Sequence, residues 1–165
     1  MATVKADKVI ENWATVVENG AGNGERLQRE LESLLAEAKM PNVSWSMGEV
    51  TTGFLSGRRE YLIIKHAGLR EYMMYVFARD QGQHLACGWF LTVTPGMFKK
   101  RFSKYMTGNP IALSRDLDVF SQEDLGAWTH IVHRMFVKIA TDLMREMQQD
   151  ITGMSTTSKG FLSVW

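Results

Sequence analysis

The spacing of apolar positions changes along the chain and predicts helices at both ends with strands between them. In the first forty residues, apolar side chains recur every three or four positions, which is the spacing of one helix face. Val9, Trp13 and either Val16 or Val17 indicate a helix over 6–19, and a leucine-rich stripe indicates a second helix over 25–40. A glycine-rich segment separates the two, so the sequence predicts an N-terminal helical pair.

From residue 43 to residue 94 the apolar spacing shortens, and β-branched and aromatic residues form runs between short turn signals. The turns are too short for parallel crossovers, which need a dozen or more residues, so neighbouring runs are expected to pair antiparallel. This region therefore predicts a four-stranded antiparallel β-meander, with strands near residues 44–55, 59–66, 71–79 and 84–94.

The helical spacing then returns, with a short helix predicted over 97–106 and a long amphipathic helix over 121–151. Ser121 is the predicted N-cap of the long helix. The predicted fold is α+β, with the helical pair, the meander and the long helix packed across one sheet face. Residues 1–151 form a single domain in this interpretation, and residues 152–165 form a polar tail with an apolar end.

The composition adds an expected compartment to this picture. The chain has 165 residues, 45% hydrophobic and 22% charged, which is typical of a globular protein. Its one cysteine, Cys87, excludes an intrachain disulfide and a multi-cysteine zinc site. The apolar stretches are too short for a signal peptide or a membrane span. The sequence thus predicts a soluble cytoplasmic protein with no membrane partner.

The residues most often used in catalysis each have a structural interpretation in this sequence. Cys87 shares its predicted strand face with large apolar residues, so its thiol is expected to be buried and inert. The glycines of residues 20–24 lack a phosphate-loop fingerprint, and an inter-helix connection is favoured. His130 and His133 lie off the apolar stripe of the long helix and are expected to be solvated. The sequence therefore predicts no catalytic residue, cofactor or metal site and leans against an enzyme.

The net charge of +1 conceals an uneven distribution along the chain. Residues 56–110 carry nine basic and three acidic side chains, whereas the segments on either side are each net negative. Basic residues next to aromatic ones can bind phosphates and stack on bases. The candidate contacts for an anion or a nucleic acid are Arg58, Arg59, Arg79, Lys99, Lys100, Arg101 and Lys104.

Two further features are candidate surfaces for a protein partner. Arg134, Lys138 and Arg145 fall on one side of the long helix, opposite its apolar stripe. Phe161 and Trp165 belong to the apolar end of the tail. This end has two interpretations: it packs back on its own domain or adds a strand to a sheet edge, or it is a short peptide that docks into another protein.

The sequence favours a non-catalytic protein-interaction or adaptor module that binds another protein and acts as a homodimer. The homodimer is predicted because a meander has two free edges, and free edges attract pairing. The first alternative is a protein that binds nucleic acid or another polyanion through residues 56–110. The second alternative is a small enzyme or a small-molecule-binding domain.

Overall fold

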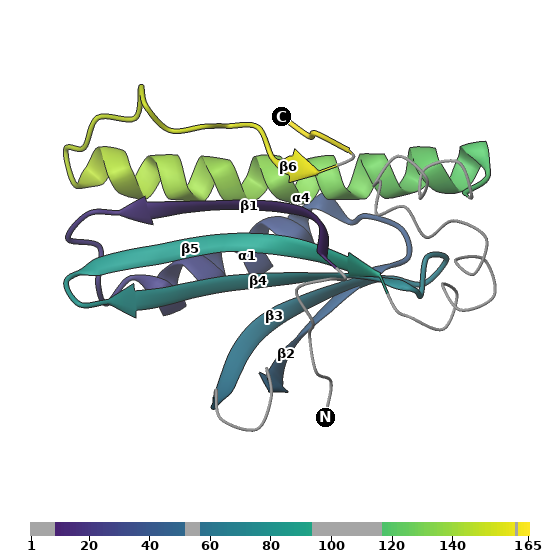
Figure 1. Ribbon diagram of the computed structural model, residues 1–165, viewed down its shortest axis with the longest axis horizontal. Coiled ribbons are helices and arrows are strands. Elements are labelled where there is room, and N and C mark those ends of the chain that lie inside the picture. The colour runs from purple at the N-terminus through teal and green to yellow at the C-terminus, as the bar shows by residue number, and fades with distance from the viewer. Residues whose placement is uncertain (1–8, 52–56, 94–116, 161) are drawn as a thin grey trace, which may run out of the picture.

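The computed structural model describes residues 9–51, 57–93, 117–160 and 162–165, which form a mixed α+β fold (Figure 1). Six strands make one antiparallel sheet in the order β2-β3-β4-β5-β1-β6. The antiparallel α+β class is confirmed, but the predicted four-stranded meander and N-terminal helical pair are wrong. The elements are β1 (Val9–Val17), α1 (Gly24–Ala38), β2 (Val43–Thr51), β3 (Arg58–His66), β4 (Tyr72–Gln81), β5 (His84–Val93), α4 (Val119–Glu146) and β6 (Lys159–Gly160).

The first predicted helix is in fact strand β1, which lies beside β5 and enlarges the sheet. Val9, Trp13 and Val17 are four residues apart, and this spacing fits one face of a strand as well as one face of a helix. Five of the nine residues in β1 are β-branched, which favours an extended backbone. Pairing with β5 places Trp13 opposite Trp89 and Val17 opposite Leu85, and all four side chains are buried.

Strands β2 to β5 follow one another in the sheet and are joined by turns. The longest ladder joins β4 and β5, from Tyr72 opposite Val93 to Gln81 opposite His84. The tight turn between them uses Gly82 at a φ of 62°, a backbone conformation that glycine adopts without steric penalty. The predicted short helix over 97–106 lies outside the described residues.

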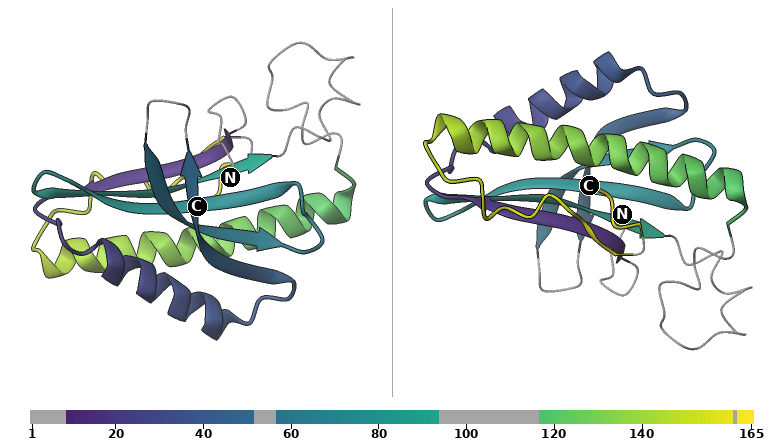
Figure 2. Two further views of the ribbon diagram at one scale, coloured as in Figure 1. Left: turned by 90° about the horizontal axis from the view of Figure 1, so that it is seen from below. Right: turned by 90° about the horizontal axis from the view of Figure 1, so that it is seen from above.

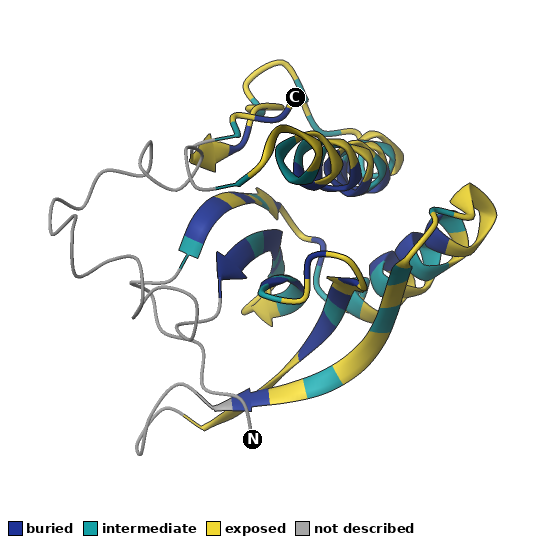
Figure 3. Cartoon of the chain, turned by 90° about the vertical axis from the view of Figure 1, so that its right-hand side faces the viewer, coloured by how far each residue is buried: buried dark blue, intermediate teal, exposed yellow. Residues whose placement is uncertain are grey.

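Both described helices lie on the same face of the sheet (Figure 2). In α1, Leu27, Leu31 and Leu35 are fully buried and belong to the main core. In α4, Phe136 packs edge-to-face against Trp13 of β1, with the ring centroids 5.9 Å apart. The residues of the main core therefore line the sides of the helices and the sheet that face each other, where Figure 3 shows buried segments.

Helix α4 begins at Val119 and ends at Glu146, whereas the sequence predicted 121–151. Asp118 is its N-cap, because the Asp118 carboxylate accepts hydrogen bonds from the Ser121 N–H (2.9 Å) and the Ser121 hydroxyl (2.8 Å). The prediction of Ser121 as the cap is therefore wrong by three residues. Neither described helix has an apolar stretch long enough to cross a membrane.

After α4 the chain reverses direction and the tail runs back alongside the helix (Figure 1). Within the tail, β6 pairs with β1, with Gly160 opposite Glu11 and Lys159 opposite Asn12. Val164 is 6% exposed and belongs to the main core. The tail thus packs on its own domain and adds a short strand to the sheet, as in the first of the two interpretations drawn from the sequence.

Candidate interaction surfaces

The two edges of the sheet differ in how they are protected. At one edge, β1 pairs with β6, and tail residues make further hydrogen bonds to side chains of β1. At the other edge, β2 pairs with β3 over nine residues, and no described strand pairs with its outer side. Such an edge presents unpaired N–H and C=O groups, and proteins usually protect it with lysine, proline or a bulge. Strand β2 contains no lysine and no proline, and its pairing with β3 has no bulge.

The side chains of β2 leave apolar surface at this bare edge. Trp45 is half-buried, and Met47 is 47% exposed on the same side of the strand, the side that faces the helices. Glu49 is the one charged residue in the strand. Its carboxylate lies 3.6 Å from the guanidinium of Arg58 on the neighbouring strand. The β2 edge thus carries the apolar surface of Trp45 and Met47, two exposed serines and one partly neutralised charge.

A second apolar cluster lies on the face of the sheet that points away from α1 and α4, called here the outer face. The rings of Tyr75 and Phe90 are stacked, with centroids 5.3 Å apart and planes 15° apart. Tyr61 meets both rings edge-on at 5.8 and 5.5 Å. The side chains packed around these rings are Val50, Ile63, Met73 and Phe77. Because both described helices lie on the other face, neither covers this cluster.

The charges at outward-facing strand positions have one sign. Successive side chains of a strand alternate between faces, so the register assigns Arg59, Lys65, Arg79 and Lys159 to the outer face. Within the described strands, the carboxylates of Glu49, Glu60 and Asp80 fall at positions that face the other way. Part of the basic character of residues 56–110 is therefore gathered on one face of the sheet.

Arg79 links the basic and aromatic groups of the outer face. Its guanidinium lies 4.3 Å from the centroid of the Tyr61 ring and 5.3 Å from that of Phe77. The same guanidinium donates a hydrogen bond of 3.0 Å to the Glu60 carbonyl oxygen. These contacts fix Arg79 against the sheet and leave its charge at the surface of the aromatic cluster.

The structure separates the predicted anion contacts into three groups. Arg59 and Arg79 share the outer face, and Arg59 is exposed with no partner among the described residues. Arg58 lies on the opposite face and is paired with Glu49. Lys99, Lys100, Arg101 and Lys104 lie outside the described residues.

The predicted protein-partner residues on α4 do not form a uniformly free basic surface. Lys138 and Arg145 both pair with Asp142, at 2.7 and 3.3 Å. Arg134 is exposed with no partner in the described part of the chain. Trp165 packs edge-on against the His130 ring, with centroids 5.5 Å apart, and remains 67% exposed. Phe161 is outside the described residues.

Glu11 is a buried acid on the core side of β1, and the sequence pattern did not identify its role. Its carboxylate accepts hydrogen bonds from the Leu162 N–H (2.8 Å), the Ser163 N–H (3.1 Å) and the Ser158 hydroxyl. Gly160 passes so close that a Cβ there would overlap the Glu11 side chain. The available signal was one acid in a segment whose other buried residues, Ile10, Trp13 and Val17, are all apolar.

Trp13 and His133 bind the part of the tail that precedes β6. The Trp13 indole N–H donates to the Ser155 carbonyl oxygen at 2.7 Å. The His133 Nδ1 accepts from the Trp89 indole N–H at 3.2 Å, so the ring proton is on Nε2, which donates to the Thr156 carbonyl oxygen at 2.7 Å. His133 is fully buried, and the prediction of a solvated histidine is therefore wrong.

Burial lowers the pKa of His133 below its usual 6.5, and the positive charge of nearby Arg134 adds to this effect. The hydrogen bond to Thr156 acts in the opposite direction but is the smaller influence. The imidazole is therefore neutral at pH 7 and acts as a bridge between the sheet and the tail.

The glycine segment 20–24 connects a strand to a helix, so the prediction of an inter-helix connection is wrong. The Gly22 N–H donates to both carboxylate oxygens of Asp80 at 3.1 Å. The Ala21 N–H donates to the Gln83 carbonyl oxygen at 3.2 Å. The loop ahead of α1 thus binds a carboxylate of its own chain, on the hairpin between β4 and β5.

Two of the chemical candidates, the cysteine and a metal cluster, can be checked in the described residues. Burial raises the pKa of the Cys87 thiol to about 12, which keeps it protonated and unreactive at neutral pH. No three His, Cys, Asp or Glu side chains in the described ranges are placed to hold a metal ion.

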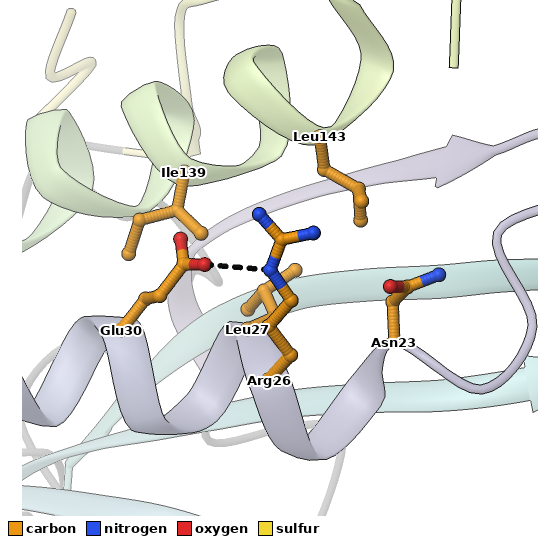
Figure 4. A pocket seen from close by; sticks show the side chains of 6 residues that line it. All are labelled: Asn23, Arg26, Leu27, Glu30, Ile139 and Leu143. Atoms are coloured by element: carbon orange, nitrogen blue, oxygen red, sulfur yellow. Dashed lines mark hydrogen bonds and ion pairs between the residues drawn. The ribbon is translucent and has the colours of Figure 1, made fainter. Parts of the chain in front are cut away.

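One small depression lies between α1 and α4 (Figure 4). Its volume of about 160 Å³ includes open solvent and is below the usual size of a ligand pocket. The Arg26 side chain lies at this depression and is ion-paired with Glu30 (2.8 Å) and Glu146 (2.7 Å). The depression is therefore accounted for by an ion-paired contact between two helices.

The candidate surfaces are thus the bare β2 edge, the basic and aromatic outer face, and the surface of β1 and α4 that binds the tail. Comparison of the chain with protein-family models, with curated proteins and with solved structures found no match.

Proposed function

We propose that this domain is a protein-interaction module that acts as a homodimer, with the outer edge of β2 as its docking site. The observation that supports this proposal is the contrast between the two edges of one sheet. At the β1 edge the tail pairs with two residues as β6 and bonds to the side chains of Glu11 and Trp13, whereas nine residues of β2 have no described partner on their outer side. Edge strands of this kind bind another strand through their backbone groups.

A second copy of β2 fits this edge better than an arbitrary strand. A two-fold axis pairs a strand with itself in antiparallel orientation, which gives each copy the same contacts. With the axis at Met47, Trp45 of one copy lies opposite Glu49 of the other. Like charges do not face each other in this register, because Glu49 is the only charged residue of the strand. The two half-exposed Met47 side chains meet at the axis and leave water.

Substitution of Met47 tests the β2 dimer. The wild-type chain is expected to have twice the chain mass by light scattering at micromolar concentration. The Met47→Lys variant places two ammonium groups at the axis and is expected to weaken association by about ten-fold or more. The matched control is Val16→Lys, which adds the same charge at a 52% exposed position of β1 and should remain dimeric. A monomeric wild-type chain at these concentrations would contradict the proposal.

We propose as a second candidate function the binding of nucleic acid or another polyanion by the outer face. The specific support is the charge of that face, where the register places Arg59, Lys65, Arg79 and Lys159 and no carboxylate of the described strands. The aromatic cluster beside Arg79 adds ring surface next to the positive charges. The geometry gives this function less support than the dimer, because Tyr61 and Tyr75 are only 4% exposed.

Salt dependence and a charge-removal variant test this candidate. A labelled single-stranded oligonucleotide of about 20 nucleotides should bind at about 50 mM salt and dissociate steeply toward about 200 mM. The Arg59→Ala/Lys65→Ala variant should bind about ten-fold more weakly at low salt. The control Arg29→Ala/Arg134→Ala removes two exposed charges from the helices on the opposite side of the sheet and should have no effect. Equal binding by the two variants would refute an outer-face site.

A further inference from the structure

The surface that binds the tail is built as a recognition site for an extended peptide. It consists of the side chains of Glu11 and Trp13 on β1 and His133 on α4, and is called here the tail-binding surface. These side chains make their hydrogen bonds to main-chain atoms of residues 155, 156, 162 and 163, and Glu11 also accepts the Ser158 hydroxyl. The contacts join segments more than 140 residues apart for β1 and 23 apart for His133.

We propose that the tail-binding surface also accepts the tail of a second copy of this chain, so that two molecules exchange residues 152–165. This inference does not rest on the β2 dimer, because it involves the opposite side of the molecule and different residues.

Glu11 explains why this surface needs an occupant. Its side chain is fully buried, and three tail donors satisfy its carboxylate: the N–H groups of Leu162 and Ser163 and the Ser158 hydroxyl. The Leu162 and Ser163 N–H groups are successive along the tail and both point at this one carboxylate. Without a bound segment, the Glu11 carboxylate loses all three of these donors, and each lost hydrogen bond favours the state in which a tail is bound.

Three tail positions determine which segment fits. Ser158 is 5% exposed, and its hydroxyl bonds to Glu11 and accepts the Val164 N–H at 2.9 Å. Gly160 has a φ of 151°, and a Cβ there would overlap the Ile10 carbonyl oxygen. Val164 fills a core position. The surface therefore selects the pattern Ser-x-Gly-x-x-x-Val in an extended segment.

A second copy carries this pattern by identity, and the connection to α4 allows its tail to be exchanged. The helix ends at Glu146, and the chain turns at Gln148, which is exposed and has a φ of 57°. Asp150, Thr152 and Gly153 are exposed as well. Opening this short connection allows the tail to leave one molecule and make the same contacts on another, which is how domain-swapped dimers form.

Peptide exchange tests the recognition step in a chain that has folded intact. A protease site is introduced at the exposed positions Thr152 and Gly153 and is cut after folding, in the Met47→Lys background so that β2 association does not contribute. A fluorescent peptide of residues 154–165 is expected to replace the cut tail and show raised anisotropy. Failure of this peptide to bind in large excess, or loss of the fold on cutting, would overturn the proposal.

Variant peptides separate specific recognition from unspecific apolar binding. Peptides with Ser158→Ala or Gly160→Val are expected to compete at least about ten-fold less well, because each removes a contact to Glu11 or creates an overlap with β1. The control peptide Lys159→Ala changes an exposed side chain and should compete as well as the original. Equal competition by Gly160→Val and the original peptide would contradict specific recognition.

Shortening the connection tests the exchange between two copies. Deletion of residues 148–151 prevents the tail from reversing onto its own molecule, so the Met47→Lys chain is expected to become a dimer by light scattering. Addition of Glu11→Gln, which replaces one of the two accepting carboxylate oxygens by an NH2 donor, should weaken that dimer by about ten-fold. A shortened chain that remains monomeric, folded or not, would contradict the exchange.

Discussion

Two polar side chains inside the core, Glu11 and His133, hold the C-terminal tail against the domain. Glu11 accepts hydrogen bonds from the tail. His133 is hydrogen-bonded to both the Trp89 indole and the Thr156 carbonyl oxygen. Neither residue has a pattern around it that predicts this role, because each depends on a segment distant in sequence. The buried arc of α4 is wider than its apolar stripe, since the sheet covers one side and the tail another, and this places His133 inside.

The neutral state of His133 predicts how stability depends on pH. Because its pKa is lowered by folding, the unfolded chain takes up a proton at this residue as the pH falls below 6.5, and the folded chain resists it. The contribution of His133 to stability is therefore fully present above pH 6.5 and is lost as the pH falls through the folded-state pKa. Urea unfolding measured between about pH 8 and pH 5 should show this loss.

The variant His133→Gln isolates this effect from the other titrating groups. Glutamine is neutral at every pH and retains an amide that can bond to Thr156, so the variant should be less stable than wild type at pH 8. The difference between the two should shrink as the pH falls below 6.5, since only the wild type loses the contribution. A difference that stays constant across this range would show that His133 is not held neutral by the fold.

At the scale of elements, two glycines in different elements are expected to respond oppositely to the same substitution. Gly88 of β5 lies against β1, and a Cβ there would be 2.8 Å from Ala14 Cα and closer still to the Trp13 carbonyl oxygen. Gly88→Ala should push the two strands apart and destabilise by about 1–3 kcal/mol. At Gly126 of α4 a Cβ would meet no neighbouring atom within 4 Å, so Gly126→Ala should stabilise by about 0.5–1 kcal/mol.

Thermal or urea unfolding of the two alanine variants measures both the expected loss and the expected gain in stability. A Gly88→Ala variant as stable as wild type would mean that β1 does not approach β5 as closely as described. A destabilising effect of Gly126→Ala would mean that this side of α4 is covered.

The elements that the sequence could predict are those with strong local signals. The leucines of α1 recur with a helical spacing only, and the apolar residues of β5 alternate as in a strand only. Both elements form near the predicted ranges. Strand β1 is mistaken for a helix because Val9, Trp13 and Val17 fit both periods, and its β-branched content is the deciding signal. Strand β6 has two residues and forms because the backbone and the Glu11 side chain of β1 bind the tail. No local sequence pattern can therefore predict it.

At the scale of the molecule, sequence order concealed which residues share a surface. Arg58 and Arg59 are adjacent in the chain but lie on opposite faces of the sheet, so they belong to different surfaces. Lys159 comes from the tail, yet the pairing of β6 brings it to the same face as Arg59. The charge of residues 56–110 was visible in the sequence, but its distribution between faces depends on the register of the strands.

The contrast between a sheet edge bound by the tail and an edge with no described partner is the central feature of the whole molecule. Hydrogen exchange of the β2 amides tests its proposed consequence most directly. In a dimer joined through β2, the outward N–H groups of residues 43–51 become hydrogen-bonded, so their exchange should slow as protein concentration rises through the dimerisation range. The Met47→Lys chain should show fast exchange at all concentrations. Exchange of residues 43–51 that is independent of concentration, in a chain whose mass doubles over the same range, would contradict the β2 dimer.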